Sequence, residues 1–261
     1  MSLCNFLYIL NFAKEMKTMD FNIHVAKVFH AFGQEIWITE SMINSWIICG
    51  LLIAIALFIR FKIRDPQKVP TGVQNVIEFI VEAFGSFSSS TMGKFGPKFS
   101  NFYLAMFLYI ICCNLSGLFL GPNIVPGTPE NPALPVTFMR PPTADIAVTL
   151  ALALITFFMT QGYGIKTKGI LAWLKGLTEP IFLLTPLNII GELANPISLS
   201  FRMFGNLLGG TIIMGLYWNL PWYTQLGIPV FLHGYFDLFA GVLQSFIFIM
   251  LSMTFVSGAM E

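Results

Sequence analysis

Apolar residues gather in long uninterrupted runs along this chain and do not alternate with polar ones. Five runs are long enough to cross a bilayer as helices, since about 20 helical residues span roughly 30 Å of hydrocarbon. They cover approximately 41–61, 102–120, 144–162, 181–217 and 228–256. Because unpaired backbone groups cannot face lipid, we predict a helix for each run. A membrane β-barrel would need short alternating segments instead.

A further helix is predicted at 71–93, where apolar residues recur at helical spacing and polar residues occupy the opposite face. The apolar set is Val73, Val76, Ile77, Ile80, Phe84 and Phe87, and the polar set is Gln74, Asn75, Glu78 and Glu82. This pattern is typical of an amphipathic helix that lies on a membrane surface or docks on a partner. The segment 121–142 is rich in Pro, Gly and Asn, and we predict irregular structure there.

The last two apolar runs are longer than a bilayer requires. The run 181–217 would extend about 55 Å as a helix, against about 30 Å of hydrocarbon. Pro186 and Pro196 can bend it near its start. We therefore predict two long, strongly inclined helices, joined by a tight hairpin at 220–229.

Composition agrees with a membrane protein. Of the 261 residues, 56% are hydrophobic and 10% are charged, with a mean hydropathy of +0.74, whereas soluble domains are about 25% charged. The fold class predicted is an all-α, polytopic membrane protein with five membrane-embedded helices and one amphipathic surface helix. A single membrane domain at 41–261 follows an extracytoplasmic or interfacial segment at 1–40. A net charge of +1 leaves no basic face for a nucleic acid.

Basic residues are distributed unequally between the two sides that five crossings define. One side carries Arg60, Lys62, Arg64, Lys68, Lys94, Lys98, Lys166, Lys168 and Lys175, and the other carries Lys14, Lys17, Lys27 and Arg140. Basic residues favour the cytoplasmic side. We therefore expect the N-terminus outside and Glu261 in the cytoplasm.

Ionisable residues inside the apolar runs are few and regularly spaced. Ionisable groups are costly in a bilayer and usually mark an ion or substrate pathway. The fourth run carries Glu192, Asn195, Arg202, Asn206 and Gly209 on one helical face; the fifth carries His233, Asp237, Gly241, Gln244 and Ser252; the third carries Asp145, Thr149, Thr156 and Thr160. Three polar stripes predict a hydrated path through a helix bundle. The alternative is that these groups pair with one another and hold the helices together.

Arg202 is the most informative of these residues. A guanidinium does not deprotonate under ordinary conditions, and no acidic residue lies near it at matched depth on its own helix. Glu192 is ten residues away, or about 15 Å along the helix axis. A fixed positive charge repels cations and attracts a carboxylate, which suits a gate between two half-paths for ions.

The segment Pro196-Ile-Ser-Leu-Ser-Phe-Arg-Met-Phe-Gly-Asn206 resembles the signature of subunit a of the bacterial F-type ATP synthase, P-x-S-L-x-x-R-x-F-G-N. Three other segments support the resemblance: Pro142-Thr-Ala-Asp145, Pro186-Leu-Asn-Ile-Ile with Glu192 after it, and Leu243-Gln-Ser-Phe-Ile-Phe248. The resemblance extends from about residue 41 to the end.

The resemblance implies a role for each polar residue. Arg202 would be the stator arginine that faces the rotating ring of c subunits, with Asn206 and Gln244 as its polar neighbours. Asp145 and Glu192 would line two aqueous half-channels. At two positions the chain differs from the familiar pattern of the family, because Thr211 and Asp237 stand in place of the residues that many members carry. The outer half-channel would therefore use Asp237 and His233.

The implied function is H⁺ or Na⁺ transfer to and from a carboxylate on the c-ring, coupled to rotation in the bacterial plasma membrane. The implied partners are the c-ring, a dimer of subunit b, the lipid bilayer and, indirectly, the soluble ATPase head. No P-loop occurs in the sequence, so we expect no nucleotide site and no catalytic residue on this chain.

Two other classes remain as alternatives. An internal inverted repeat would favour a free-standing secondary transporter, and no such repeat is evident in the sequence. An intramembrane metalloenzyme would need more ligands than His233 and Asp237. We therefore expect no metal and no cofactor.

Overall fold

The computed structural model describes residues 25–31, 34–62, 72–119, 122–124, 135–137, 141–178, 182–218, 231–232 and 234–261. The first long helix is α2 (Glu40–Lys62), which agrees closely with the predicted run 41–61. The surface helix and the second run form α3 (Val73–Met92) and α4 (Gly96–Phe119). The third run is α5 (Ile146–Lys168), the fourth is α7 (Thr185–Trp218), and the fifth contains η4 (Gly234–Ala240) and α9 (Gly241–Met260).

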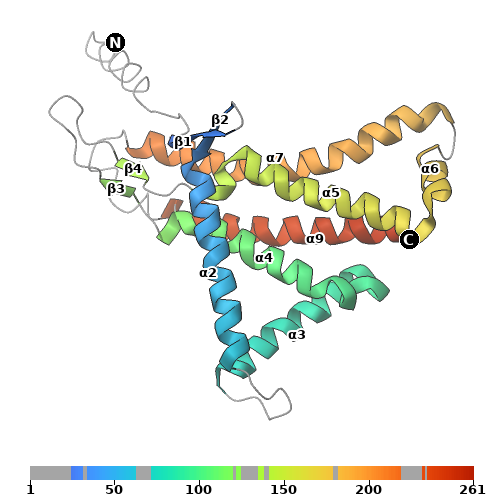
Figure 1. Ribbon diagram of the computed structural model, residues 1–261, viewed down its shortest axis with the longest axis horizontal. Helices are drawn as coiled ribbons and strands as arrows, with labels where there is room; N and C mark the ends of the chain where they lie inside the picture. Colours follow the sequence, from blue (N-terminus) through green and yellow to red (C-terminus); the bar gives the residue numbers. More distant parts are fainter. Residues whose placement is uncertain are drawn as a thin grey trace, which may run out of the picture.

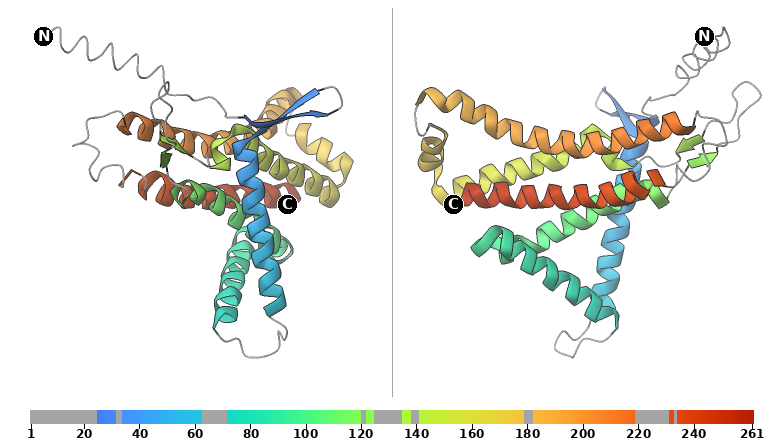
Figure 2. Two further views of the ribbon diagram at one scale, coloured as in Figure 1. Left: turned by 60° about the vertical axis from the view of Figure 1, so that its left-hand side comes forward. Right: turned by 180° about the vertical axis from the view of Figure 1, so that it is seen from behind.

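Three helices lie side by side and form the body of the molecule, in which α5 contacts both α7 and α9. Figure 1 shows them crossing the direction of α2, and the view from behind in Figure 2 shows the same arrangement. A hydrogen bond of 2.9 Å joins Thr156 Oγ1 and Ser252 Oγ, and the Gly164 backbone approaches Ala259. These two contacts show that α5 and α9 run in the same direction.

Helix α7 runs antiparallel to α5. Ser200 Oγ donates to Thr149 Oγ1 at 3.1 Å, and Gln161 Nε2 donates to Glu192 Oε2 at 2.7 Å. Later residues of α7 therefore lie beside earlier residues of α5. Pro196 lies inside α7 without ending it.

The buried core lies where α4, α5, α7 and α9 meet. Its fully buried side chains include Tyr103, Ala153, Met203, Phe248 and Met253. The Tyr103 hydroxyl donates to the Ser252 carbonyl oxygen at 3.3 Å. Outside this core, large apolar side chains are exposed, which is typical of a surface that faces lipid.

Helices α3 and α4 meet at a tight corner, with the short 3₁₀ turn η1 (Gly93–Phe95) between them. A Cβ at Gly96 would lie 2.5 Å from the Ser89 Cα atom, so the close approach of the two helices requires glycine. The apolar face of α3 packs only at its C-terminal half, where Phe84 contacts Phe107 and Phe87 contacts Phe246. Val76 and Ile80 remain exposed.

Four helical stretches in the described ranges are long and apolar enough to cross a membrane. They are Ser41–Phe61, Val73–Gly117, Ile146–Lys168 and Gly234–Met260. These four stretches confirm the predicted class of a helical, multi-pass membrane protein. The predicted number of five embedded helices, their inclination and the division at residue 40 stay predictions.

Several local features differ from the expectations. An antiparallel pair, β1 (Val25–Ala31) and β2 (Gln34–Thr39), precedes α2. Between 121 and 142, where we expected irregular structure, β3 (Pro122–Ile124) pairs with β4 (Pro135–Thr137), and the 3₁₀ turn η2 (Pro142–Ala144) leads into α5.

A short helix after α5 was also not foreseen, and the fourth run, predicted as helix from residue 181, begins with a 3₁₀ turn. The nine-residue helix α6 (Ile170–Thr178) follows α5, and the 3₁₀ turn η3 (Phe182–Leu184) leads into α7. Within the fifth run, η4 is a π-helix and not the α-helix that we predicted. The predicted hairpin at 220–229 lies outside the described residues.

Candidate functional site

Arg202 lies on the outside of α7 with its side chain exposed. No ion pair to Arg202 occurs among the side chains that the structure describes. The contact between Ser200 and Thr149 places Arg202 beside the first turn of α5, nearer to Asp145 than to Glu192. Its exposure leaves the guanidinium available to a group outside this chain.

Two contacts of α7 with η4 and α9 bracket Arg202 and Asn206 on α7 and Gln244 on α9. A Cβ at Gly210 would lie 3.1 Å from the Phe236 Cβ atom, and Leu199 and Phe255 line one cavity. Arg202 and Asn206 fall between these contacts on α7, and Gln244 falls between them on α9.

The amide nitrogens of Asn206 and Gln244 are both buried without a hydrogen-bond partner in the structure. Buried polar groups nearly always have a partner. The region therefore offers two amide donors for water or for a group from another chain.

Glu192 is held at the opposite end of the α5–α7 contact. Its Oε2 atom accepts a hydrogen bond of 2.7 Å from Gln161 Nε2, and Gln161 Oε1 accepts one of 3.0 Å from Trp173 Nε1 on α6. Both Glu192 and Gln161 are partly buried.

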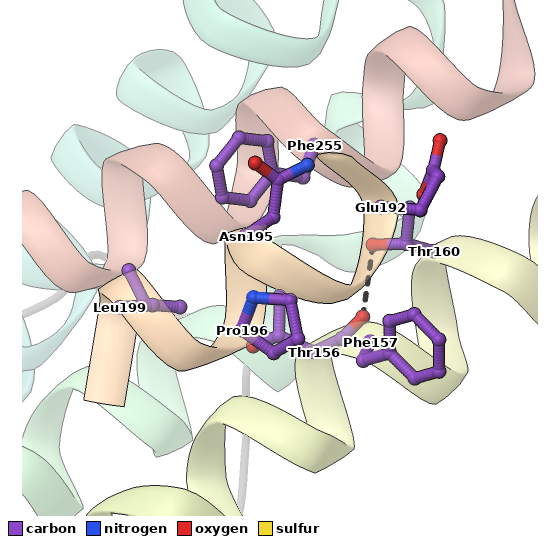
Figure 3. Close-up of a pocket in the computed structure, with 8 residues that line it drawn as sticks. All are labelled: Thr156, Phe157, Thr160, Glu192, Asn195, Pro196, Leu199 and Phe255. Atoms are coloured by element: carbon purple, nitrogen blue, oxygen red, sulfur yellow. Dashed lines mark hydrogen bonds between the residues drawn. The ribbon is translucent and has the colours of Figure 1, made fainter. Parts of the chain in front are cut away.

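A small cavity adjoins Glu192 between α5, α7 and α9, as Figure 3 shows. Its lining consists of Thr156, Phe157, Thr160, Glu192, Asn195, Pro196, Leu199 and Phe255. The volume is about 10 Å³, near the lower limit for one water molecule. Thr160 Oγ1 donates to the Thr156 carbonyl oxygen at 2.9 Å. Among the lining residues, Glu192 has the ionisable side chain and can carry a charge.

Asp145 lies at the start of α5 and caps it. Its Oδ1 atom accepts a hydrogen bond of 3.0 Å from the Ala147 backbone N–H, in the manner of an N-cap. Its Oδ2 atom accepts one of 2.8 Å from Ser41 Oγ on α2, and Ser41 Oγ shares a hydrogen bond of 2.9 Å with Thr39 Oγ1. Asp145 and Glu192 thus lie at opposite ends of α5.

The predicted residues on the fifth run are only partly described. Asp237 lies within the π-helix η4, and its side chain, like the whole of His233, lies outside the described residues. A π-helix has i→i+5 hydrogen bonds, so the face that we assigned from α-helical spacing does not hold through 234–240. Thr211, the other departure from the family pattern, donates to the Leu207 carbonyl oxygen at 2.9 Å.

Four contributing residues were missed by sequence reasoning: Ser41, Asn114, Gln161 and Trp173. Asn114 Nδ2 donates to the Gly241 carbonyl oxygen at 2.9 Å and to Ser245 Oγ at 2.8 Å, where η4 passes into α9. Asn114 and Gln161 were detectable as amides within or beside apolar runs. Ser41 and Trp173 carried no such signal.

No group of three His, Cys, Asp or Glu side chains that could hold a metal ion occurs in the described part of the chain. The polar groups found here are hydrogen-bond donors, two carboxylates and one exposed guanidinium. Such a set can bind and pass small cations and water.

Comparison with known proteins identifies the family. Residues 42–257 match the family model described as ATP synthase A chain. The chain belongs to this family. The match includes Asp145, Glu192, Arg202, Asn206 and Gln244, and it confirms the resemblance drawn from the segment 196–206.

Individual members of the ATP synthase A chain family are similar over most of their length. The subunit a of Propionigenium modestum, described as sodium ion specific, is 33% identical over 223 residues, which cover 85% of this chain and 74% of the relative. The subunit a of Moorella thermoacetica is 31% identical over 238 residues, covering 91% and 97%. That of Staphylococcus carnosus is 33% identical over 233 residues, covering 87% and 92%. Membership makes this chain a subunit of an ATP synthase and supports its multi-pass membrane topology.

Proposed function

We propose that this chain is the stator channel subunit of an F-type ATP synthase, in which Arg202 separates two half-channels that serve a c-ring carboxylate. The observation that carries the proposal is the exposure of Arg202 on the side of a long apolar helix. An exposed guanidinium within a membrane needs a partner of opposite charge. A carboxylate on a neighbouring rotor satisfies that need transiently.

The surface around Arg202 supports a rotating protein partner. Phe201 and Ile197 are 55% and 50% exposed, so the arginine lies in an apolar surface that another apolar helix can cover. Helix α7 also runs along one edge of the bundle, visible in Figure 1 and from behind in Figure 2. We assign this edge to the c-ring.

Two acidic sites support two half-channels. Asp145 is held at the start of α5 and Glu192 beside its C-terminal half, and Arg202 lies on α7 nearer to Asp145. With the N-terminus outside, Asp145 belongs to the outer half-channel together with Asp237 and His233. Glu192 then belongs to the cytoplasmic half-channel, near Lys166 and Lys168.

The arrangement of helices also supports the inclination predicted from length. In Figure 1, α5, α7 and α9 run across the direction of α2. If α2 crosses the bacterial plasma membrane upright, then α7 and α9 lie steeply inclined beside the ring. The exposed apolar faces of α2 and α3 would then meet lipid and the subunit b dimer, and the soluble ATPase head would be reached only through other subunits.

The transported ion is H⁺ or Na⁺. One relative is described as sodium ion specific, and a channel lined by carboxylates and amides serves either ion. Moving one charge through 100 mV releases about 2.3 kcal/mol, so several ions must pass for each ATP. This chain supplies the path, and ATP chemistry takes place elsewhere in the complex.

The proposal is tested by Arg202→Ala in the assembled complex. We expect ATP-driven ion uptake into inverted vesicles to be lost while ATPase subunits remain bound to the membrane. Uptake is followed both as acidification and as sodium entry, so that either ion is detected. A complex that assembles normally and pumps at the wild-type rate would refute the proposal. A free-standing transporter would instead move its solute after purification without ATPase subunits.

A further inference from the structure

Three side chains from three helices form a continuous chain of hydrogen bonds beside the cavity. Trp173 on α6 donates to Gln161 on α5, and Gln161 donates to Glu192 on α7, at 3.0 Å and 2.7 Å. The channel function proposed above uses Glu192 but assigns nothing to Gln161, Trp173 or α6.

The orientation of the Gln161 amide is fixed by the chemistry of its two neighbours. An indole N–H can only donate, and an ionised carboxylate can only accept. The amide oxygen must therefore face Trp173, and the NH₂ group must face Glu192. Turning the amide over would break both hydrogen bonds at once.

Helix α6 is placed so that one of its side chains reaches inward. Gly169, with φ of +83°, ends α5 and turns the chain, and the Trp173 backbone N–H donates to the Gly169 carbonyl oxygen at 3.0 Å. Trp173 is partly buried, whereas Leu171 and Leu174 beside it are 85% and 48% exposed. The outer face of α6, which carries Leu171 and Leu174, thus suits the membrane interface, whereas the Trp173 indole points to the bundle.

Gly164 on α5 packs tightly against α9 and lies in ordinary contact range of Trp173. A Cβ at Gly164 would lie 3.7 Å from the Trp173 Cδ1 atom and 3.3 Å from the Ala259 carbonyl oxygen. The site is therefore built from α5, α6, α7 and α9 together.

We propose that Gln161, oriented by Trp173, is a positioning residue that holds the Glu192 carboxylate at the cavity on the cytoplasmic side. The proposal rests on the channel function proposed for this chain. A glutamate side chain has several rotamers, and a single well-oriented donor restricts them. Ion transfer through Glu192 then starts from one carboxylate position, and α6 contributes to the path without touching the ion.

The competing explanation is that Gln161 only ties α5 to α7. A tie between helices would persist with glutamine at 192, because the amide oxygen of glutamine still accepts a hydrogen bond from Gln161, whereas a positioning residue acts through the Glu192 carboxylate alone. Glu192→Gln removes that carboxylate and keeps both the side-chain length and an acceptor for Gln161. A double-mutant cycle therefore separates the two explanations.

The experiment measures ATP-driven ion uptake per assembled complex in inverted vesicles for Gln161→Met, Trp173→Phe, Glu192→Gln and the double variant Gln161→Met with Glu192→Gln. Gln161→Met keeps side-chain length and removes both hydrogen bonds, so we expect a loss of about tenfold, as for a hydrogen bond to a charged group. Trp173→Phe removes only the orienting donor, and we expect a loss of about threefold. The double variant should match Glu192→Gln alone, whereas a tie between helices would give a further loss.

A matched control is available on α3. Gln74 Nε2 donates to Glu78 Oε1 at 2.8 Å on an exposed surface, which is the same amide–carboxylate pair away from the cavity. Gln74→Met should leave uptake unchanged.

Two results would overturn the inference. One is wild-type uptake in assembled Gln161→Met. The other is a double variant that falls below Glu192→Gln by the full Gln161→Met factor. If Gln161→Met does not assemble, Trp173→Phe decides, and unchanged uptake in that variant contradicts the inference. Arg202→Ala is measured in parallel: normal pumping there refutes the channel function itself, whereas lost pumping with a neutral Gln161→Met refutes only the inference.

Discussion

The two acidic sites at the ends of α5 are held in different ways. Asp145 is fixed mainly by its own segment, because it caps α5 through the Ala147 backbone N–H and, among the described residues, receives one further side-chain hydrogen bond, from Ser41. Glu192 lies inside a helix, where its backbone is already satisfied, and its carboxylate depends on Gln161 from another helix. A cap is a local device, whereas the Glu192 site depends on tertiary packing. The sites should therefore respond differently to mutation.

The largest difference is expected when each carboxylate is neutralised. Glu192→Gln removes the ionisable group of its cavity, while Asp145→Asn leaves Asp237 and His233 to serve the outer path. We expect uptake to fall by about tenfold or more for Glu192→Gln. For Asp145→Asn we expect a loss of only about threefold. The measurement is ATP-driven uptake in inverted vesicles. Equal losses of uptake in the two variants would contradict the expected difference between the Glu192 and Asp145 sites.

The second difference concerns stability. Asp145→Ala removes the cap of α5, which costs about 1 kcal/mol and should lower the midpoint of thermal unfolding by about 2–4 °C. Asp145→Asn keeps a good capping side chain and should lose much less. Thermal unfolding of the detergent-solubilised complex measures both variants. Identical midpoints for the two variants would show that the cap contributes nothing.

The smallest effect is expected at Ser41. Ser41→Ala removes one of two hydrogen bonds to Asp145, and the cap still orients the carboxylate. Uptake should change by no more than about twofold, well below the effect expected for Gln161→Met at the other end of α5. A loss at Ser41 as large as that at Gln161 would mean that α2 holds the outer site as firmly as α5 holds the inner one.

Hydrophobic periodicity predicted the long helices well because lipid imposes one strong requirement on them. The run 41–61 matches α2, and the segment 196–206 identified both the family and the position of Arg202. The π-helix at 234–240 was missed because its composition is the same as that of an α-helix, and only packing decides between the two hydrogen-bond patterns.

Short elements were harder to predict. Helix α6 is nine residues long, far below a membrane span, so it was grouped with a loop. The pair β1–β2 does carry β-branched and aromatic residues, such as Val28, Ile36 and Trp37. We nevertheless predicted no strands there and described residues 1–40 as one N-terminal segment. Charged site residues were found because charge is conspicuous in an apolar run. Their neutral partners Ser41, Gln161 and Trp173 become visible only when helices far apart in sequence are brought together.

The central claim is that Arg202 keeps the two half-channels apart, and passive ion flow measures this most directly. Vesicles containing the complex are stripped of the soluble ATPase head, and ion flux down an imposed potential is compared for wild type and Arg202→Ala. With its positive charge removed, we predict that the variant passes ions at least as fast as wild type, although it no longer pumps with ATP when the head is restored. Passive flux through Arg202→Ala that is clearly slower than through wild type would contradict the account.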